Sequence, residues 1–495
     1  DGGNAPLANR FSARSGAGRD KGVMTLALPR LDPLARPAPV PRAGGLWRLV
    51  VLVLAVLALA VRPAAAQSIL RDAETEALFA DMMGPLEEAA GLKRGQIRVH
   101  LIGDRSINAF VAGTQDIYIH SGMIEAAGSA NEVQGVMAHE LGHIMGGHSI
   151  RIQDGASTAG GISLLSLLLG AAAVAAGAGD AGMGIMMAGQ QAALGKFLAF
   201  SRTQEATADA AGAQYLSRAG ITGRGSLDFF KRLQNLEFRY AVKQDDDQAY
   251  GRTHPLSGDR IQALRETYMV DPAWDTPSDP AIEARFARVK AKLVGFVAEP
   301  ARVLRLYPDS DKGINARYAR AYAWHRSAYP DRALAEVNAL VAAKPADPYF
   351  LELQGQILLE SGRPRDAIAP LRLAVEKSRG QPLIAALLGH ALIATEDPAL
   401  RVEAEQVLRT AVTIDNENPF AWYQLGVVYA AKGDQARAAL ATAERYHLQG
   451  RAAPLALQNA EMAMASLPEG TPDWIRAQDI ALVSRAEVER QRKRR

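Results

Sequence analysis

The most constraining feature of the sequence is the motif H-E-x-x-H at residues 139–143, within the stretch GVMAHELGHIMGGH. Residues four apart lie on one face of an α-helix, so His139 and His143 can direct both imidazoles at one metal ion. Glu140 lies beside them, within reach of a water molecule on that ion. Apolar residues around the motif recur at helical spacing, which predicts a helix that weakens or ends at the glycine pair 146–147.

Composition limits which kinds of site the chain can contain. A length of 495 residues predicts two or three domains. The chain has no cysteine, which excludes disulfides, a thiolate nucleophile and a thiolate-ligated metal, so a metal site must use histidine and carboxylate. Residues 1–66 carry nine of the 56 basic residues and three of the 53 acidic ones, so the remainder is nearly neutral. It therefore lacks the basic footprint of a nucleic-acid-binding protein.

The N-terminal region has the pattern of a targeting segment. Residues 1–46 are rich in Pro, Gly, Ala and Arg without periodicity, which predicts a disordered or spurious extension with Met24 as a candidate start. Residues 47–66 combine a basic start, a short apolar run and small residues, which predicts a signal peptide cleaved after Ala66. The apolar run at 49–61 is shorter than the roughly 20 residues of a transmembrane helix, so an uncleaved anchor is the alternative.

Residues 67–270 predict an α+β domain in which a small sheet packs on the motif helix. An amphipathic helix is expected over 69–91, and Ser129 or Asn131 is expected to cap the motif helix. The free edge of the sheet could accept an extended peptide as an added strand and position its bond over the metal. Alternating apolar residues predict three strands, at 97–102, 108–111 and 117–119.

Residues 155–198 are unusually apolar and allow three interpretations. Ile162–Ala176 is almost wholly apolar, Gly177–Gly184 is glycine-rich, and Ile185–Leu198 is apolar again. Neither arm has 18 uninterrupted strongly apolar residues, as a membrane-spanning helix requires. The simplest expectation is a buried helical pair, and the alternatives are a lid near the metal or a hairpin that contacts a membrane.

A third metal ligand is expected further along the chain, because a catalytic zinc usually has three protein ligands and one open position. His148 is a poor candidate, since it lies nine residues after His139, about half a turn around the helix. Glu205 is better, because the stretch SRTQEATADAA predicts a second helix that bears it. Asp209 faces the same way and could accept the free ring N–H of a ligand histidine.

These residues resemble those of the HtpX/BepA/Oma-type zinc metallopeptidases, gluzincins in which a downstream glutamate completes the H-E-x-x-H site. The resemblance covers residues 68–270, and the single N-terminal apolar segment places the chain nearer the periplasmic branch than the membrane-embedded members. It implies a zinc metalloendopeptidase with one Zn²⁺ held by His139, His143 and Glu205, and with Glu140 as general base and acid. The matching residues are Asn108-Ala109-Phe110, His139-Glu140-Leu141-Gly142-His143, Ser201-Arg202, Glu205, Ala208-Asp209, Thr253-His254-Pro255 and Arg260-Ile261.

The resemblance also implies roles for His254 and Arg260. In the periplasmic relatives the equivalent loop can lie over the zinc, with its histidine blocking the water position. By that analogy His254 is a latency switch or, when displaced, a catalytic residue on the oxyanion side. Arg260 could pair with a site carboxylate or polarise the substrate carbonyl, and the sequence leaves these alternatives open.

The C-terminal part of the chain is repetitive. Residues 422–429 match the pattern W-x2-L-G-x2-Y, which resembles tetratricopeptide repeats, paired helices of 34 residues that stack on their neighbours. Four repeats are expected over about 312–449. The corresponding helix positions, at intervals of 34, 34 and 37 residues, are Ala321, Gly355, Gly389 and Gly426.

These features divide the rest of the chain into a linker at 271–300, where prolines cluster, an all-α repeat superhelix at 301–486 and a basic tail at 487–495. The concave surface of such a superhelix implies a peptide or protein partner. The alternative is that the repeats only brace the preceding domain.

The interpretation that the resemblance favours is a zinc-dependent periplasmic endopeptidase that degrades misfolded or stalled envelope and outer-membrane proteins. Glu140 would take a proton from the attacking water and pass it to the leaving amine. The repeats would recruit these clients or the outer-membrane assembly machinery, and peripheral membrane contact through 155–198 stays open. The alternative is a chaperone-like assembly adaptor that works through its repeats while the protease site is latent. A prenyl-protein protease is disfavoured, because the additional transmembrane helices are missing.

Overall fold

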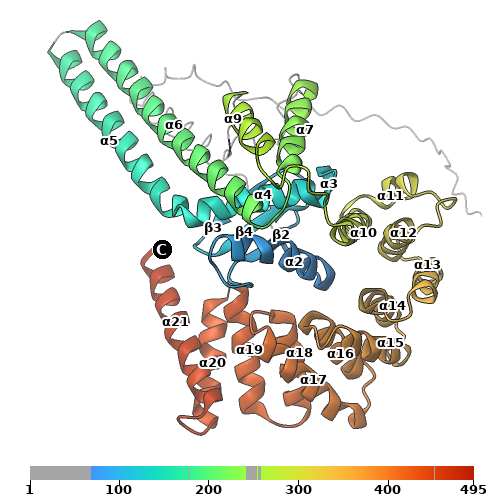
Figure 1. The fold of residues 1–495 in the computed structure, drawn as a ribbon. Helices are drawn as coiled ribbons and strands as arrows, with labels where there is room; N and C mark the ends of the chain where they lie inside the picture. Colours follow the sequence, from blue (N-terminus) through green and yellow to red (C-terminus); the bar gives the residue numbers. More distant parts are fainter. Residues whose placement is uncertain (1–67, 177, 241–253, 255–257, 451, 495) are drawn as a thin grey trace, which may run out of the picture. The chain divides into compact units, whose positions relative to one another are not determined.

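The computed structural model describes residues 68–176, 178–240, 254, 258–450 and 452–494, and its ribbon is drawn in Figure 1. The predicted extension at 1–46 and the predicted signal peptide at 47–66 lie outside these residues. Residues 67–495 form one compact unit.

A mixed four-stranded sheet, as expected for the first domain, has the strand order β1-β2-β4-β3. The central pair β2 and β4 is parallel, while β1 and β3 are antiparallel edge strands. The three predicted strands are confirmed as β2, β3 and β4. The strands are β1 (Ile69–Leu70), β2 (Arg98–Ile102), β3 (Ala109–Ala112) and β4 (Asp116–His120).

The first helix, α2 (Ala73–Ala89), begins four residues later than predicted. Ile69 and Leu70 instead pair with β2, and Asp72 caps the helix by accepting the backbone N–H of Thr75 at 2.7 Å. A two-residue strand is too short to show an alternating pattern, so its apolar residues were assigned to the predicted helix. The remaining helices of this region are α3 (Ser121–Ala126), α4 (Ala130–Met145), α5 (His148–Ala175), α6 (Gly179–Arg218), α7 (Arg224–Tyr240), α9 (Gly258–Met269) and α10 (Pro280–Val297).

The motif helix α4 lies at the centre of the principal apolar core. Its cap is Ser129, whose hydroxyl accepts the backbone N–H of Glu132 at 3.1 Å, which decides between the two predicted caps. Met137 and Leu141 of α4 pack in one cluster with side chains from α2, β4, α3 and α7. The cluster also contains Phe286 of α10, so part of the predicted linker packs on the first domain. The domain boundaries themselves stay a prediction.

The predicted buried pair at 155–198 is a long exposed hairpin, formed by α5 and the first half of α6 (Figure 1). In the apolar window of α5 only 11% of the residues are buried, so the buried interpretation is wrong. Apolar composition alone does not distinguish a core helix from an exposed one. Among the described residues, α5 is the one helix whose length and composition would allow it to span a membrane.

The C-terminal region is a succession of short paired helices, as the repeat pattern predicted. The four pairs are followed by two further helices, and α21 continues through the basic residues at 487–494. The helices are α11 (Pro300–Leu306), α12 (Ile314–Arg326), α13 (Pro330–Ala343), α14 (Pro348–Glu360), α15 (Pro364–Lys377), α16 (Pro382–Ala394), the short 3₁₀ helix η2 (Pro398–Leu400), α17 (Arg401–Ile414), α18 (Pro419–Ala431), α19 (Gln435–Gln449), α20 (Ala453–Ser466) and α21 (Pro472–Arg494).

The recurring glycines of the repeats lie where the two helices of a pair touch. A Cβ on Gly355 would lie 2.4 Å from the side chain of Leu371, and one on Gly389 would lie 2.5 Å from Leu408. The helices therefore pack closely only because these positions carry no side chain.

A buried ionic cluster connects α10 with α2 and with the repeats. Lys292 pairs with Asp72 and Glu74 at the start of α2. Arg288 pairs with Glu74 and, at 2.5 Å, with Asp347, which caps α14. Removing one member of such a cluster leaves a buried charge without its partner. These residues therefore determine how α10 packs against α2 and α14.

Candidate metal centre

The centre is built on a close contact between the backbones of α4 and α6. A Cβ on Gly142 of α4 would lie 2.6 Å from the carbonyl oxygen of Ala208 on α6. On the other side of the same contact, a Cβ on Gly212 would lie 3.0 Å from the carbonyl oxygen of Ala138. The two glycines therefore allow the motif face of α4 to meet the carboxylate-bearing face of α6.

The structure brings His139, His143 and Glu205 together. The Nε2 atoms of the two histidines are 3.1 Å apart, and each lies 3.4 Å from one carboxylate oxygen of Glu205. All three side chains are buried. Three donor atoms thus converge on one point, although the third comes from another helix, 62 residues after His143.

His254 lies in the same cluster. Its Nδ1 is 3.1 and 3.2 Å from the two carboxylate oxygens of Glu205 and 3.3 Å from His139 Nε2. Its Nε2 is 3.5 Å from Oε1 of Glu140. His254, for which the sequence left two roles open, is therefore among the candidate ligands.

Asp209 and Arg260 lie behind the candidate ligands. Asp209 Oδ1 is 2.9 Å from His139 Nδ1, the ring nitrogen that faces away from the cluster. Arg260 donates to both carboxylate oxygens of Asp209, at 2.7 and 2.9 Å, and its Nη1 is 2.9 Å from Glu205. Of the two alternatives for Arg260, this geometry is that of a partner for the site carboxylates.

Burial and hydrogen bonding shift the pKa values of this cluster in opposite directions. Burial lowers the pKa of His139, but hydrogen bonds to Asp209 and Glu205 outweigh it and raise that pKa to about 10. Burial raises the pKa of the Glu205 carboxyl, but hydrogen bonds from His139, His143 and His254 hold it far below its usual range. A buried cluster that stabilises an ionised carboxylate next to positive charge also stabilises a bound cation.

His148 is a residue whose position the sequence argument missed. It is no part of the ligand cluster, yet its Nδ1 lies 2.9 Å from His143 Nδ1, and its Nε2 lies 3.2 Å from the hydroxyl of Thr207. Burial, followed by repulsion from His143, lowers the pKa of His148 to about 4, so a neutral ring faces His143. Gly147 has φ 64 and starts a new helix, so extrapolating α4 to position 148 placed this ring wrongly.

The residues present fit a divalent metal. One donor atom each from His139, His143, Glu205 and His254 lies within 4.8 Å of the others. Both carboxylate oxygens of Glu140 are buried and have no hydrogen-bond partner among the described residues. A mixed set of imidazole and carboxylate donors is the set that catalytic zinc uses.

Comparison with known proteins places this centre in a family. Residues 69–268 match the model of peptidase family M48. Residues 69–268 form a metallopeptidase domain of family M48.

Similarity to known proteins extends beyond the matched domain. The beta-barrel assembly-enhancing protease of Yersinia pestis is 24% identical over 367 residues, which cover 72% of this chain and 73% of the relative. Metalloprotease LoiP of Escherichia coli K12 is 31% identical over 172 residues, 34% of this chain and 61% of LoiP. The crystal structure of MamA matches 35% of this chain and 96% of its own, with 20% identity and a TM-score of 0.27.

The contact between α4 and α6 yields a first prediction. Gly142→Ala should force the helices apart and lower the free energy of unfolding by about 1–3 kcal/mol. Because the ligands sit on the two helices, zinc affinity should fall at least about tenfold, a change of 1.4 kcal/mol. Thermal unfolding and competition with a chromophoric chelator measure the two effects.

Gly184→Ala is the matched control, because a Cβ at Gly184 on α6 meets nothing within 4 Å. It should leave zinc affinity unchanged. Equal zinc affinity in Gly142→Ala and the unmodified M48 protein would show that the close backbone contact does not position the ligands.

Proposed function

We propose that the protein is a zinc-dependent endopeptidase of the periplasm that degrades misfolded or stalled outer-membrane proteins. The observation that carries the proposal is the convergence of His139, His143 and Glu205 around one point, with the carboxylate of Glu140, which accepts no hydrogen bond from the described residues, beside it. An M48 domain with this arrangement has the parts that metal-assisted peptide hydrolysis requires.

In this mechanism His139, His143 and Glu205 would hold the zinc, one ion per chain. Zinc supplies a Lewis acid that polarises the scissile carbonyl and makes water acidic enough to attack near neutral pH. Glu140 takes the proton from the attacking water and passes it to the nitrogen of the leaving amine. Asp209 orients His139 through its outer ring nitrogen, and Arg260 holds Asp209 and Glu205 in place.

The substrate would bind as an added strand. β3 is an edge strand that pairs with β4 on one side, and it lies against α4. An extended chain that pairs with the other side of β3 would place its peptide bonds along the motif helix. This mode selects unfolded segments, because a folded chain has already used its backbone hydrogen-bonding groups.

Location and clients are inferred from two further observations. The signal-peptide pattern at 47–66 supports export with cleavage near Ala66-Gln67, and an anchor formed by 49–61 is the alternative. The similarity to a protein named for enhancing beta-barrel assembly supports outer-membrane proteins as clients.

The position of His254 supports regulation of the centre. The ring contacts Glu205 and His139 and faces Glu140, so it occupies space that water and substrate need. We assign it the role of a latency switch that must leave before cleavage. A latent state is also compatible with the adaptor role, in which the repeats assist assembly while the protease site is inactive.

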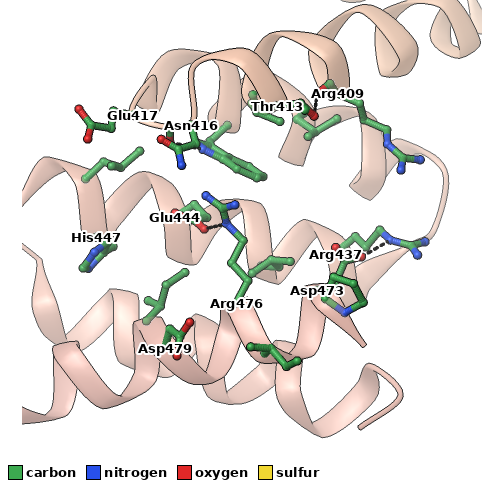
Figure 2. Close-up of a pocket in the computed structure, with 18 of the residues that line it drawn as sticks. Arg409, Thr413, Asn416, Glu417, Arg437, Glu444, His447, Asp473, Arg476 and Asp479 are labelled. Carbon is green, nitrogen blue, oxygen red and sulfur yellow. Dashed lines mark hydrogen bonds and ion pairs between the residues drawn. The ribbon is translucent and has the colours of Figure 1, made fainter. Parts of the chain in front are cut away.

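A groove in the last repeats is suited to recruit a chain. It has a volume of about 920 Å³ and lies between α17, α18, α19 and α21. Figure 2 shows Arg476 directed at Glu444 and Arg437 at Asp473, so charged pairs lie among the apolar residues that line the groove. Trp422 and Val483 add apolar surface to the groove, and Val483 is exposed. Aromatic and apolar anchors within a polar rim are typical of peptide-binding surfaces.

The hydrolytic mechanism is tested with Glu140→Gln. This variant should bind zinc as before but cleave an unfolded substrate about 100-fold more slowly or worse, because the proton carrier is gone. Glu88→Gln, at an exposed carboxylate of α2, is the control. Retained hydrolysis would refute the mechanism, and full complementation of a deletion strain by Glu140→Gln would favour the adaptor role.

The latency role is tested with His254→Ala. Removing the ring should raise the initial rate of casein cleavage by about 3–10-fold. This is the increase expected when the cleavage-competent state is stabilised by about 1 kcal/mol relative to the blocked state. His325→Ala, which removes a hydrogen bond with Glu360 in the repeats, should leave the rate unchanged. An unchanged rate in His254→Ala would exclude the switch, and a lower rate would favour the catalytic alternative.

The groove is tested with adjacent exposed residues of α21. Val483 lines the groove and Leu482 does not, although their exposures are similar at 53 and 57%. Val483→Glu should weaken binding of an unfolded outer-membrane protein about tenfold in fluorescence anisotropy, while Leu482→Glu should not. Casein cleavage should be unchanged in both. Equal affinities would exclude this groove as the recruiting surface.

A further inference from the structure

The hairpin of α5 and the first half of α6 exposes a large apolar surface to solvent. Five leucines in one stretch of α5 are each between 50 and 60% exposed, and the facing arm adds Met183, Ile185 and Met187. Contiguous apolar surface of this kind marks an interaction site in a soluble protein. The leucines are Leu164, Leu165, Leu167, Leu168 and Leu169.

Around the five leucines, the side of α5 that α6 does not cover is apolar. At 100° per residue, the five leucines spread over about 200° of the circumference of α5. The remaining side holds Ser163, Ser166 and Gly170, which face α6. A Cβ on Gly170 would lie 2.7 Å from the carbonyl oxygen of Gly182, so the two arms pack through small residues. A second protein helix would cover one stripe about 100° wide and leave much of this surface in water.

Length and charge distribution match a bilayer. Residues 155–175 of α5 carry no charge and extend about 31 Å, close to the roughly 30 Å of a hydrocarbon core. Asp180 is the only charged residue between 155 and 195 in the sequence, and it lies at the tip of the hairpin. At the base, Arg151, Lys196 and Arg202 are exposed and positively charged, as suits anionic headgroups.

We propose that the α5–α6 hairpin inserts tip-first into a lipid bilayer and attaches the M48 domain to the membrane surface. This inference goes beyond the proposed function, and it does not depend on proteolysis. The occupant is lipid rather than a second copy, because only a surrounding apolar medium buries the whole exposed circumference. Packing through Ser166, Gly170, Gly182 and Gly189 suits helices associated in lipid, where close backbone approach replaces the hydrophobic drive.

The test uses residues 67–495, which form a compact unit without the N-terminal apolar run. Vesicles of phosphatidylethanolamine and phosphatidylglycerol should bind this protein in a flotation assay. Leu165→Gln with Leu168→Gln should reduce the bound fraction at least about tenfold, since polar amides would have to enter hydrocarbon. The matched control is Val402→Gln with Ile414→Gln on α17, where the side chains are equally exposed, at 69 and 60%.

A second measurement reports insertion directly. Because the chain has no cysteine, Leu168→Cys gives a single thiol for an environment-sensitive fluorophore. Its emission should shift to the blue with vesicles and be quenched by brominated acyl chains, while a label on Val402→Cys should show neither effect.

Three results would overturn the proposal. The first is no binding to vesicles, and the second is equal binding by the hairpin and control variants. The third is a concentration-dependent dimer without lipid that the hairpin variant abolishes, which would assign the surface to a second copy. None of these results depends on whether Glu140 supports hydrolysis, so failure here is distinguishable from failure of the proposed function.

Discussion

The metal centre depends on the contact between the backbones of α4 and α6. Gly142 and Gly212 carry no side chains, so the helices approach until the two histidines of one meet the glutamate of the other. This contact gathers three carboxylates, Glu140, Glu205 and Asp209, in a buried space. Such a cluster is unfavourable unless positive charge compensates it. The side chain of Arg260 supplies part of that charge, and the donor set suits a divalent cation for the rest.

Much of this arrangement could be predicted because it follows local rules. Helical spacing put His139 and His143 on one face, and the sequence narrowed the cap of that helix to Ser129 or Asn131, of which the structure uses the hydroxyl of Ser129. Glu205 was identifiable because a catalytic zinc site needs a third ligand and its helix offered a carboxylate with Asp209 one turn further. In two of the repeats, glycine recurs at the same position because the helix pair packs closely there, at Gly355 and Gly389.

The features that were not predictable depend on partners distant in sequence or on backbone turns. β1 exists because Ile69 and Leu70 pair with Ile102 and Leu101. Two residues are too few to show an alternating hydrophobic pattern, so the sequence did not reveal this strand. The role of His148 could not be read from helix geometry, because Gly147 redirects the chain. The exposure of the hairpin was also hidden, since a run of Leu, Ala and Gly looks the same in a core as outside it. Arg260 had two chemically sensible targets, and only the fold directs it to Asp209 and Glu205.

The hairpin and the metal centre are parts of the same helices, which constrains where catalysis would occur. His148 is the first residue of α5, and Glu205 lies on α6, which runs without a break from Gly179 to Arg218. Lys196, at the base of the apolar region, is nine residues before Glu205, about 14 Å along the helix. If the hairpin were inserted in a bilayer as far as Lys196, the metal centre would therefore lie close above the headgroups. Under the proposed function, chains that have not entered the membrane would meet at that height an edge strand suited to receive them.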